Sequence, residues 1–213
     1  MRKVFWIATL VTLFCSCHQV DATNNALSQV PIKKVVFNND FYFKLADAAI
    51  QLTHQQVTYD PDYVSIPYPN GDVAANKGVC ADVIIRAYRL LGIDLQKEVH
   101  EDMVAHFSQY PNIYGLKKTD TNIDHRRVPN LMKFFQRKGK SKKLSTDPAD
   151  YQYGDIVCWD LGKQSHIGIV IDEKSSDGKR PLIVHNIGGG QVIADALFAY
   201  PIIGHYRYEK INL

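Results

Sequence analysis

The sequence has little of what marks the specialised classes of protein. Four cysteines are too few for a domain built on disulfides, and 25 basic against 22 acidic residues leave a net charge of +3, which does not mark a nucleic-acid binder. The apolar run Val4 to Phe14 is too short to cross a bilayer. No internal repeat or low-complexity tract is visible. With 46% hydrophobic residues over 213 positions, the chain is predicted to form one compact domain.

The first residues have the pattern of an export signal. Arg2 and Lys3 precede the apolar run, whose length is typical of the hydrophobic part of a signal peptide. We therefore interpret residues 1–22 as a signal peptide that leads into a linker, and residues 23–39 as a linker or arm in which a short strand is expected at 32–37. The mature protein is expected to work outside the cytoplasm, in the periplasm or attached to the cell envelope.

The end of the apolar run also favours a lipid anchor. A small residue, Ser16, directly precedes Cys17, as in a lipoprotein signal, so Cys17 is predicted to be lipidated, with plain cleavage near Ala22 as the alternative. A mature chain beginning at Cys17 loses two basic residues and no acidic one, which leaves 23 basic against 22 acidic residues. The positive charge therefore belongs mostly to the signal.

Helical patterns dominate the first half of the remaining chain. Apolar residues recur at helical spacing over 41–54, after Asn39 or Asp40 as a cap, and over 80–91, which Gly92 ends. Two weaker helices are predicted at about 98–109 and 127–137. The interval 57–79 is rich in proline, glycine and tyrosine and is predicted to be a long loop.

The second half has the pattern of short strands separated by turns, so helices first and an antiparallel sheet second predict an α+β domain. A solvated helix end and loop is expected for the basic residues Arg137, Lys138, Lys140, Lys142 and Lys143. The predicted strands are 155–160, 166–172, 182–186, 192–194 and 203–208.

Only Cys80 and Cys158 remain after the export segment. One interpretation for an exported protein is a disulfide bond between these two cysteines. Cys158 lies in a short apolar run, where a cysteine behaves as a small buried hydrophobe. Cys80 lies where a loop enters a helix, and the helix dipole there is expected to lower the pKa of a thiol. Cys80 is therefore the candidate nucleophile.

Two histidines on predicted strands could serve this thiol. His166 opens a strand and is the candidate general base, with the small Gly168 expected to let a helix approach closely. His185 ends the next strand, and a hairpin turning near 176–178 would bring the two histidines side by side. His185 would then orient the base, with Asn186 as the competing choice.

The order of these motifs resembles the signature of NlpC-type papain-like cysteine peptidases, which cut peptide bonds in bacterial cell walls. Two further stretches, 123–131 and 204–208, resemble a bacterial family of exported proteins within that superfamily, domain-of-unknown-function family 1287. The resemblance covers about 40–208. It rests on Gly78-Val79-Cys80-Ala81-Asp82-Val83, Tyr153-Gly154-Asp155-Ile156-Val157, Ser165-His166-Ile167-Gly168-Ile169-Val170 and Val184-His185-Asn186.

The resemblance implies a papain-like domain over 40–213, with N-terminal helices packed on a C-terminal antiparallel sheet. Position by position, it makes Cys80 the nucleophile, His166 the general base and His185 the orienting residue. The superfamily's Asp-Cys-Ser-Gly is replaced here by Val79-Cys80-Ala81-Asp82. The interval 95–150 is longer than in compact members and could cover the cleft.

Supporting or substrate-contacting roles are considered for Asn186, Asp82 and Asp155, although Asp155 is more simply a turn residue before its strand. The cluster Asp124-His125-Arg126-Arg127 is interpreted as holding the inserted region to the core, with binding of a substrate carboxylate as the alternative.

The sequence thus predicts an exported cysteine amidase or peptidase that acts on cell-wall peptides through a thioester. No cofactor, metal or nucleic acid is expected, because no zinc-binding spacing of histidine or cysteine is present. Two alternatives stay open: an inert papain-like module that binds wall fragments or a protein partner, and a thiol acyltransferase. Nothing in the sequence indicates the oligomeric state.

Overall fold

A computed structural model describes residues 40–210, all of which belong to one compact unit. The interpretations of Cys15, Cys17 and Ala22, and of a strand at 32–37, lie outside the described residues. Over the described range, no helix has both the length and the apolar character needed to cross a bilayer.

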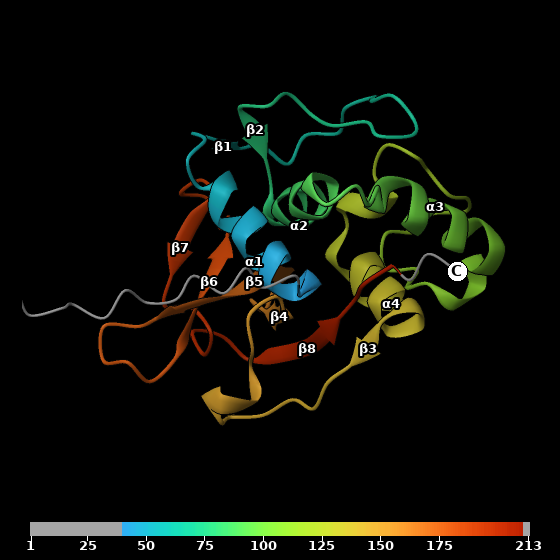
Figure 1. Cartoon of the computed structure of the whole chain (residues 1–213). Helices are drawn as coiled ribbons and strands as arrows, with labels where there is room; N and C mark the ends of the chain where they lie inside the picture. Colours follow the sequence, from blue (N-terminus) through green and yellow to red (C-terminus); the bar gives the residue numbers. More distant parts are fainter. Residues whose placement is uncertain (1–39, 211–213) are drawn as a thin grey trace, which may run out of the picture. The chain divides into compact units, whose positions relative to one another are not determined.

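All four predicted helices are present (Figure 1). The side chain of Asp40 caps the first by accepting the Tyr42 N–H at 3.0 Å, and Asp94 caps the third, which therefore starts earlier than predicted. Gly92, at φ 77°, ends the second in the left-handed region that favours glycine. The helices are α1 Phe41–Leu52, α2 Cys80–Leu90, α3 Leu95–His106 and α4 Val128–Lys138, with short 3-10 helices η1 Phe107–Gln109, η2 Asp124–Arg126 and η3 Pro148–Asp150.

The five predicted strands are also present, in one antiparallel sheet of six with the order β3-β8-β4-β5-β6-β7. The sequence analysis missed the edge strand β3 and a small parallel pair, β1 with β2, inside the predicted loop. The bounds are β1 Thr58–Tyr59, β2 Lys77–Gly78, β3 Lys140–Ser141, β4 Ile156–Asp160, β5 Ser165–Lys174, β6 Pro181–His185, β7 Val192–Ala194 and β8 Ile202–Arg207.

The main core lies between the helices and one face of the sheet, where α1 and α2 pack on β5 (Figure 1). Ile167 and Ile169 of β5 belong to this core. A smaller cluster around Trp159 and Val170 covers the opposite face. The alternation of side chains along β5 therefore separates two apolar layers, and the α+β prediction is confirmed.

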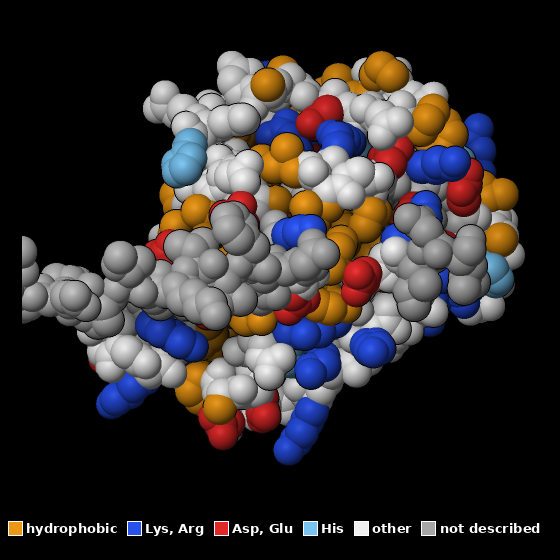
Figure 2. Space-filling model, viewed as in Figure 1, with side chains coloured by type: hydrophobic (Ala, Val, Ile, Leu, Met, Phe, Trp, Pro, Cys, Tyr) orange, Lys and Arg blue, Asp and Glu red, His pale blue; other side chains and the backbone are white. Residues whose placement is uncertain are grey.

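One local expectation was wrong, and a second was confirmed in part. Gly168 does not admit a helix: a Cβ there would lie 2.7 Å from Ile183 Cγ2 and 3.2 Å from His185 Cβ, so the missing side chain makes room for β6. The basic helix end and loop are exposed at Lys138, Lys140, Lys142 and Lys143, as predicted, but Arg137 and Lys138 also pair with the buried Asp102 at 2.6 and 3.1 Å. Basic and acidic side chains are interspersed on the face shown in Figure 2, in keeping with the small net charge.

Candidate functional site

Cys80 is the first residue of α2 and is 6% exposed. The turn that carries it is fixed by Asp82, whose carboxylate accepts the backbone N–H of Val79 at 2.7 Å. Backbone N–H groups of Ile167, Ala81 and Cys80 itself lie against the sulfur. The sulfur therefore faces main-chain donors both from its own helix and from β5.

The pKa of Cys80 differs from the expectation. Burial raises it to about 11, the Ile167 N–H lowers it, and the negative charge of Asp82 raises it again. Donors at the helix start do favour the thiolate, but removal from water outweighs them. The expected lowering of the pKa was thus wrong, and the resting sulfur is a neutral thiol that needs a base.

His166 and His185 meet as the hairpin predicted. His166 Nε2 and His185 Nδ1 are 2.8 Å apart, and the side chains are 4% and 5% exposed. The ring of Trp159 lies 5.7 Å from that of His166 and holds it in place. When His166 donates its Nε2 proton to His185, its Nδ1 keeps a free lone pair, which is the state a general base requires.

Burial, with positive charge on His185 as the smaller cause, lowers the pKa of His166 to about 4. The pKa of His185 is also lowered by burial. Both rings are consequently neutral at neutral pH. At rest, the candidate nucleophile is therefore a neutral thiol and the candidate base belongs to a neutral imidazole pair.

The backbone N–H of Ile167, the residue after His166, lies near the sulfur of Cys80. Among residues 40–210, no hydrogen bond joins the thiol to either imidazole. Cys80 and Cys158 are both free, so the alternative of a disulfide between them is not realised. Cys158 is fully buried in β4, as the sequence indicated.

Asn186 does not contact His166 through a hydrogen bond. Its side chain donates to the Gly78 carbonyl at 3.3 Å and accepts the Gly188 N–H at 3.1 Å. Asn186 thus ties the end of β6 to the strand that leads into Cys80. Of the two choices for the orienting residue, His185 is the one that touches the base.

Asp82 and Asp155 both have structural partners. Asp82 pairs with Arg126 through two hydrogen bonds of 2.9 and 3.0 Å. Asp155 accepts from His205 at 2.6 Å and from Arg207, and thereby ties β4 to β8. Asp82 therefore lies at the site, whereas Asp155 bonds to none of the three candidate catalytic residues.

Tyr59 of β1 is a residue that the sequence analysis missed. Burial raises its pKa, negative charge at Cys80 and Asp82 raises it further, and Arg126 lowers it. Its hydroxyl thus lies within electrostatic reach of the sulfur. The short pairing of Tyr59 with Gly78 brings it there. A two-residue strand in a proline-rich loop leaves no periodic signal that could have predicted this.

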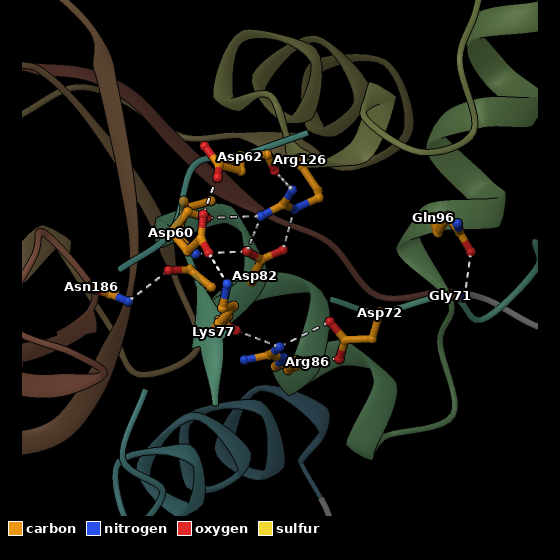
Figure 3. A network of polar contacts seen from close by, with 12 residues as sticks. Asp60, Asp62, Gly71, Asp72, Lys77, Asp82, Arg86, Gln96, Arg126 and Asn186 are labelled. Carbon is orange, nitrogen blue, oxygen red and sulfur yellow. Dashed lines mark hydrogen bonds and ion pairs between the residues drawn. The ribbon is translucent and has the colours of Figure 1, made fainter. Parts of the chain in front are cut away.

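The Asp124–Arg127 cluster has the structural role that was favoured. Arg126 binds Asp82, and Asp124 accepts from His100 at 3.0 Å (Figure 3 shows Arg126). Across the described part of the chain, no three side chains of the types that bind metals are grouped to hold an ion.

Comparison with known families places this chain. The model of a domain of unknown function, DUF1287, matches residues 46–208. The chain belongs to this family. A relative by sequence is the uncharacterized protein YijF of Escherichia coli K12, which is 48% identical over 209 residues and is matched over 98% of both chains.

Two solved structures are similar to a lesser degree. Both are of an N-acetylmuramoyl-L-alanine amidase from Bacteroides uniformis, at 12% and 11% identity and TM-scores of 0.46 and 0.45. Each match covers 79% of this chain and 99% of the other. Similarity this low carries no argument about function. The site of this DUF1287 protein is therefore interpreted from its own residues.

Proposed function

We propose that this DUF1287 protein is a papain-like, NlpC-type cysteine amidase or peptidase that hydrolyses amide bonds in cell-wall peptides. The observation that carries the proposal is a cysteine, Cys80, at the first turn of α2, in a domain whose sheet also carries a buried, hydrogen-bonded histidine pair. A cysteine, a base and a residue that orients the base are the parts that nucleophilic acyl transfer requires.

The chemistry begins with proton transfer. His166 Nδ1 takes the thiol proton of Cys80 as the sulfur attacks the carbonyl carbon, and the N–H groups of Cys80 and Ala81 stabilise the oxyanion. The imidazolium then protonates the leaving amine as the C–N bond breaks, which leaves a thioester. His166 then takes a proton from water as the water oxygen attacks the thioester carbon. The C–S bond breaks, the carboxylic acid leaves, and His166 returns the proton to the sulfur.

His185 keeps the base in its working state. Its contact with Nε2 selects the tautomer of His166 with the lone pair on Nδ1. The mechanism uses only side chains, backbone N–H groups and water, and therefore needs no cofactor.

The substrate class and the location are parts of the proposal. The export pattern at residues 1–22 puts the protein in the periplasm or on the cell envelope, where wall peptides are found, and lipidation of Cys17 would hold it there. The resemblance of the motifs to NlpC-type enzymes supports the same substrate class.

Mass spectrometry of purified wall fragments tests the function. Wild-type protein should produce pairs of new amine and carboxyl termini, and His166→Ala should produce none because the thiol loses its base. Unchanged fragments that still bind the protein would support the inert binding module instead. Fragments joined to an added amine, without hydrolysis products, would support the acyltransferase.

The pH dependence of hydrolysis gives a further prediction. His166 must be neutral to accept a proton, and burial lowers its pKa to about 4. We therefore expect kcat/KM to rise with pH through about 4 and to be flat near neutrality. An acidic limb centred near the usual histidine value of about 6.5 would contradict the buried neutral base. Rates measured from pH 3.5 to 8, with folding followed by circular dichroism, decide between the two.

A further inference from the structure

We propose that Arg126 is a positioning residue for the nucleophile, acting through Asp82 to cancel the negative charge next to Cys80 and to fix the first turn of α2. The inference rests on the proposed function only in treating Cys80 as the nucleophile. Arg126 lies in η2, within the long insertion between α2 and the sheet, so this insertion supplies part of the site.

The contacts of Arg126 converge on the nucleophile turn. Its guanidinium holds Asp82 at 2.9 and 3.0 Å, and the same carboxylate accepts the Val79 N–H at 2.7 Å. On its other side the guanidinium donates to the carbonyls of Asp62 and Asp60 at 3.3 and 3.5 Å (Figure 3). One side chain therefore joins the loop after β1 to the start of α2.

The loop is joined to the nucleophile strand a second time. The Asp60 N–H donates to the Gly78 carbonyl at 3.2 Å, and the Asp60 carboxylate pairs with Lys77 at 2.6 Å. Asn186 holds the same Gly78 carbonyl from β6. The backbone that precedes Cys80 is thus held by Asp60, by Asn186 and by Asp82. Among the described residues, Arg126 is the only cation that forms an ion pair with Asp82.

Charge explains why the pair matters for the reaction. Asp82 is 3% exposed and Arg126 is 7% exposed, so water screens neither. The sulfur and the oxyanion both become negative during acyl transfer, and an unpaired carboxylate on the same helical turn would oppose them. Asp82 already raises the pKa of Cys80 in the presence of Arg126.

Other ionisable groups face the sulfur from the elements packed around it, and they stay unchanged when the pair is altered. They are Tyr59 of β1 and Cys158 of β4.

Alkylation of Cys80 by iodoacetamide in the full-length protein tests the inference without any substrate. Peptide mapping by mass spectrometry separates Cys80 from the other cysteines. Arg126→Gln should slow alkylation about tenfold at pH 8, because the unpaired carboxylate of Asp82 lowers the fraction of Cys80 present as thiolate about tenfold. With substrate, the same variant should lower kcat about tenfold and leave KM unchanged.

The double variant Asp82→Asn/Arg126→Gln separates charge from simple anchoring. It removes both charges and keeps an amide oxygen that can accept the Val79 N–H, so alkylation should return to within about threefold of wild type. An anchor alone would predict no recovery. Arg137→Gln is the matched control. It breaks another two-bond arginine–aspartate pair, which joins α4 to Asp102 of α3, and it should alkylate like wild type.

Two outcomes would overturn the inference: alkylation in Arg126→Gln at the wild-type rate, or a double variant as slow as the single one. If Arg126→Gln does not fold, Arg126→Lys keeps the charge and should stay within about threefold of wild type, and a tenfold loss there would also overturn it. Because alkylation needs no hydrolysis, failure to cut wall peptides leaves this test intact.

Discussion

Cys80→Ala is expected to abolish hydrolysis of cell-wall peptides. The sulfur is the only protein atom that forms a covalent bond to the substrate in the proposed mechanism. Loss of a nucleophile lowers kcat by on the order of 10⁶. Release of new termini from purified fragments, quantified by mass spectrometry, should therefore fall below detection. Binding of the fragments should persist, because alanine leaves the surrounding surface unchanged.

The chain offers a matched control for this variant. Cys158 is the other cysteine of the described residues, is fully buried, and pairs with Ile167 across β4 and β5. Cys158→Ala should lose some stability and keep its activity per folded molecule, since only packing is removed. Cys80→Ser, which preserves the shape of the side chain, guards against a folding defect. Activity in Cys80→Ala that matches Cys158→Ala would refute the proposed mechanism.

The sequence predicted those parts of the molecule that have a local signal. The four helices have apolar stripes and caps such as Asp40, and the strands have short apolar runs between turns. The meeting of His166 with His185 followed from one turn, near 176–178, because a hairpin fixes which strand ends lie together.

The rest depends on contacts between distant segments. Tyr59 reaches the sulfur through a two-residue parallel pairing, and Arg126 reaches Asp82 from an insertion whose path has no sequence pattern. The direction of the pKa shift at Cys80 could not be predicted from the sequence either, because it depends on burial of the thiol by the packed domain. The helix start was identified correctly, but its dipole is the smaller effect.

Asp155→Ala is expected to destabilise the fold strongly without changing the chemistry. Asp155 is fully buried and accepts hydrogen bonds from His205 and Arg207 of β8 and from the Gln152 N–H. Burial opposes its ionisation, but these donors outweigh burial and lower its pKa. Its contribution to stability is therefore present above the pKa of the unfolded chain and is lost as the pH falls through the lower pKa of the folded state.

Removing Asp155 leaves the mostly buried guanidinium of Arg207 without its carboxylate, a loss worth about 3–5 kcal/mol. For a domain of this size, the midpoint of thermal unfolding should fall by roughly 6–20 °C. Glu101→Ala, which breaks an ion pair with Lys97 on the surface, is the control and should leave the midpoint near wild type. Calorimetry measures both variants at neutral pH, and hydrolysis is measured well below their unfolding temperatures. Because Asp155 bonds to neither Cys80 nor the histidine pair, its folded variant should hydrolyse like wild type, and a large loss of kcat there would mean that β8 acts on the site through β4.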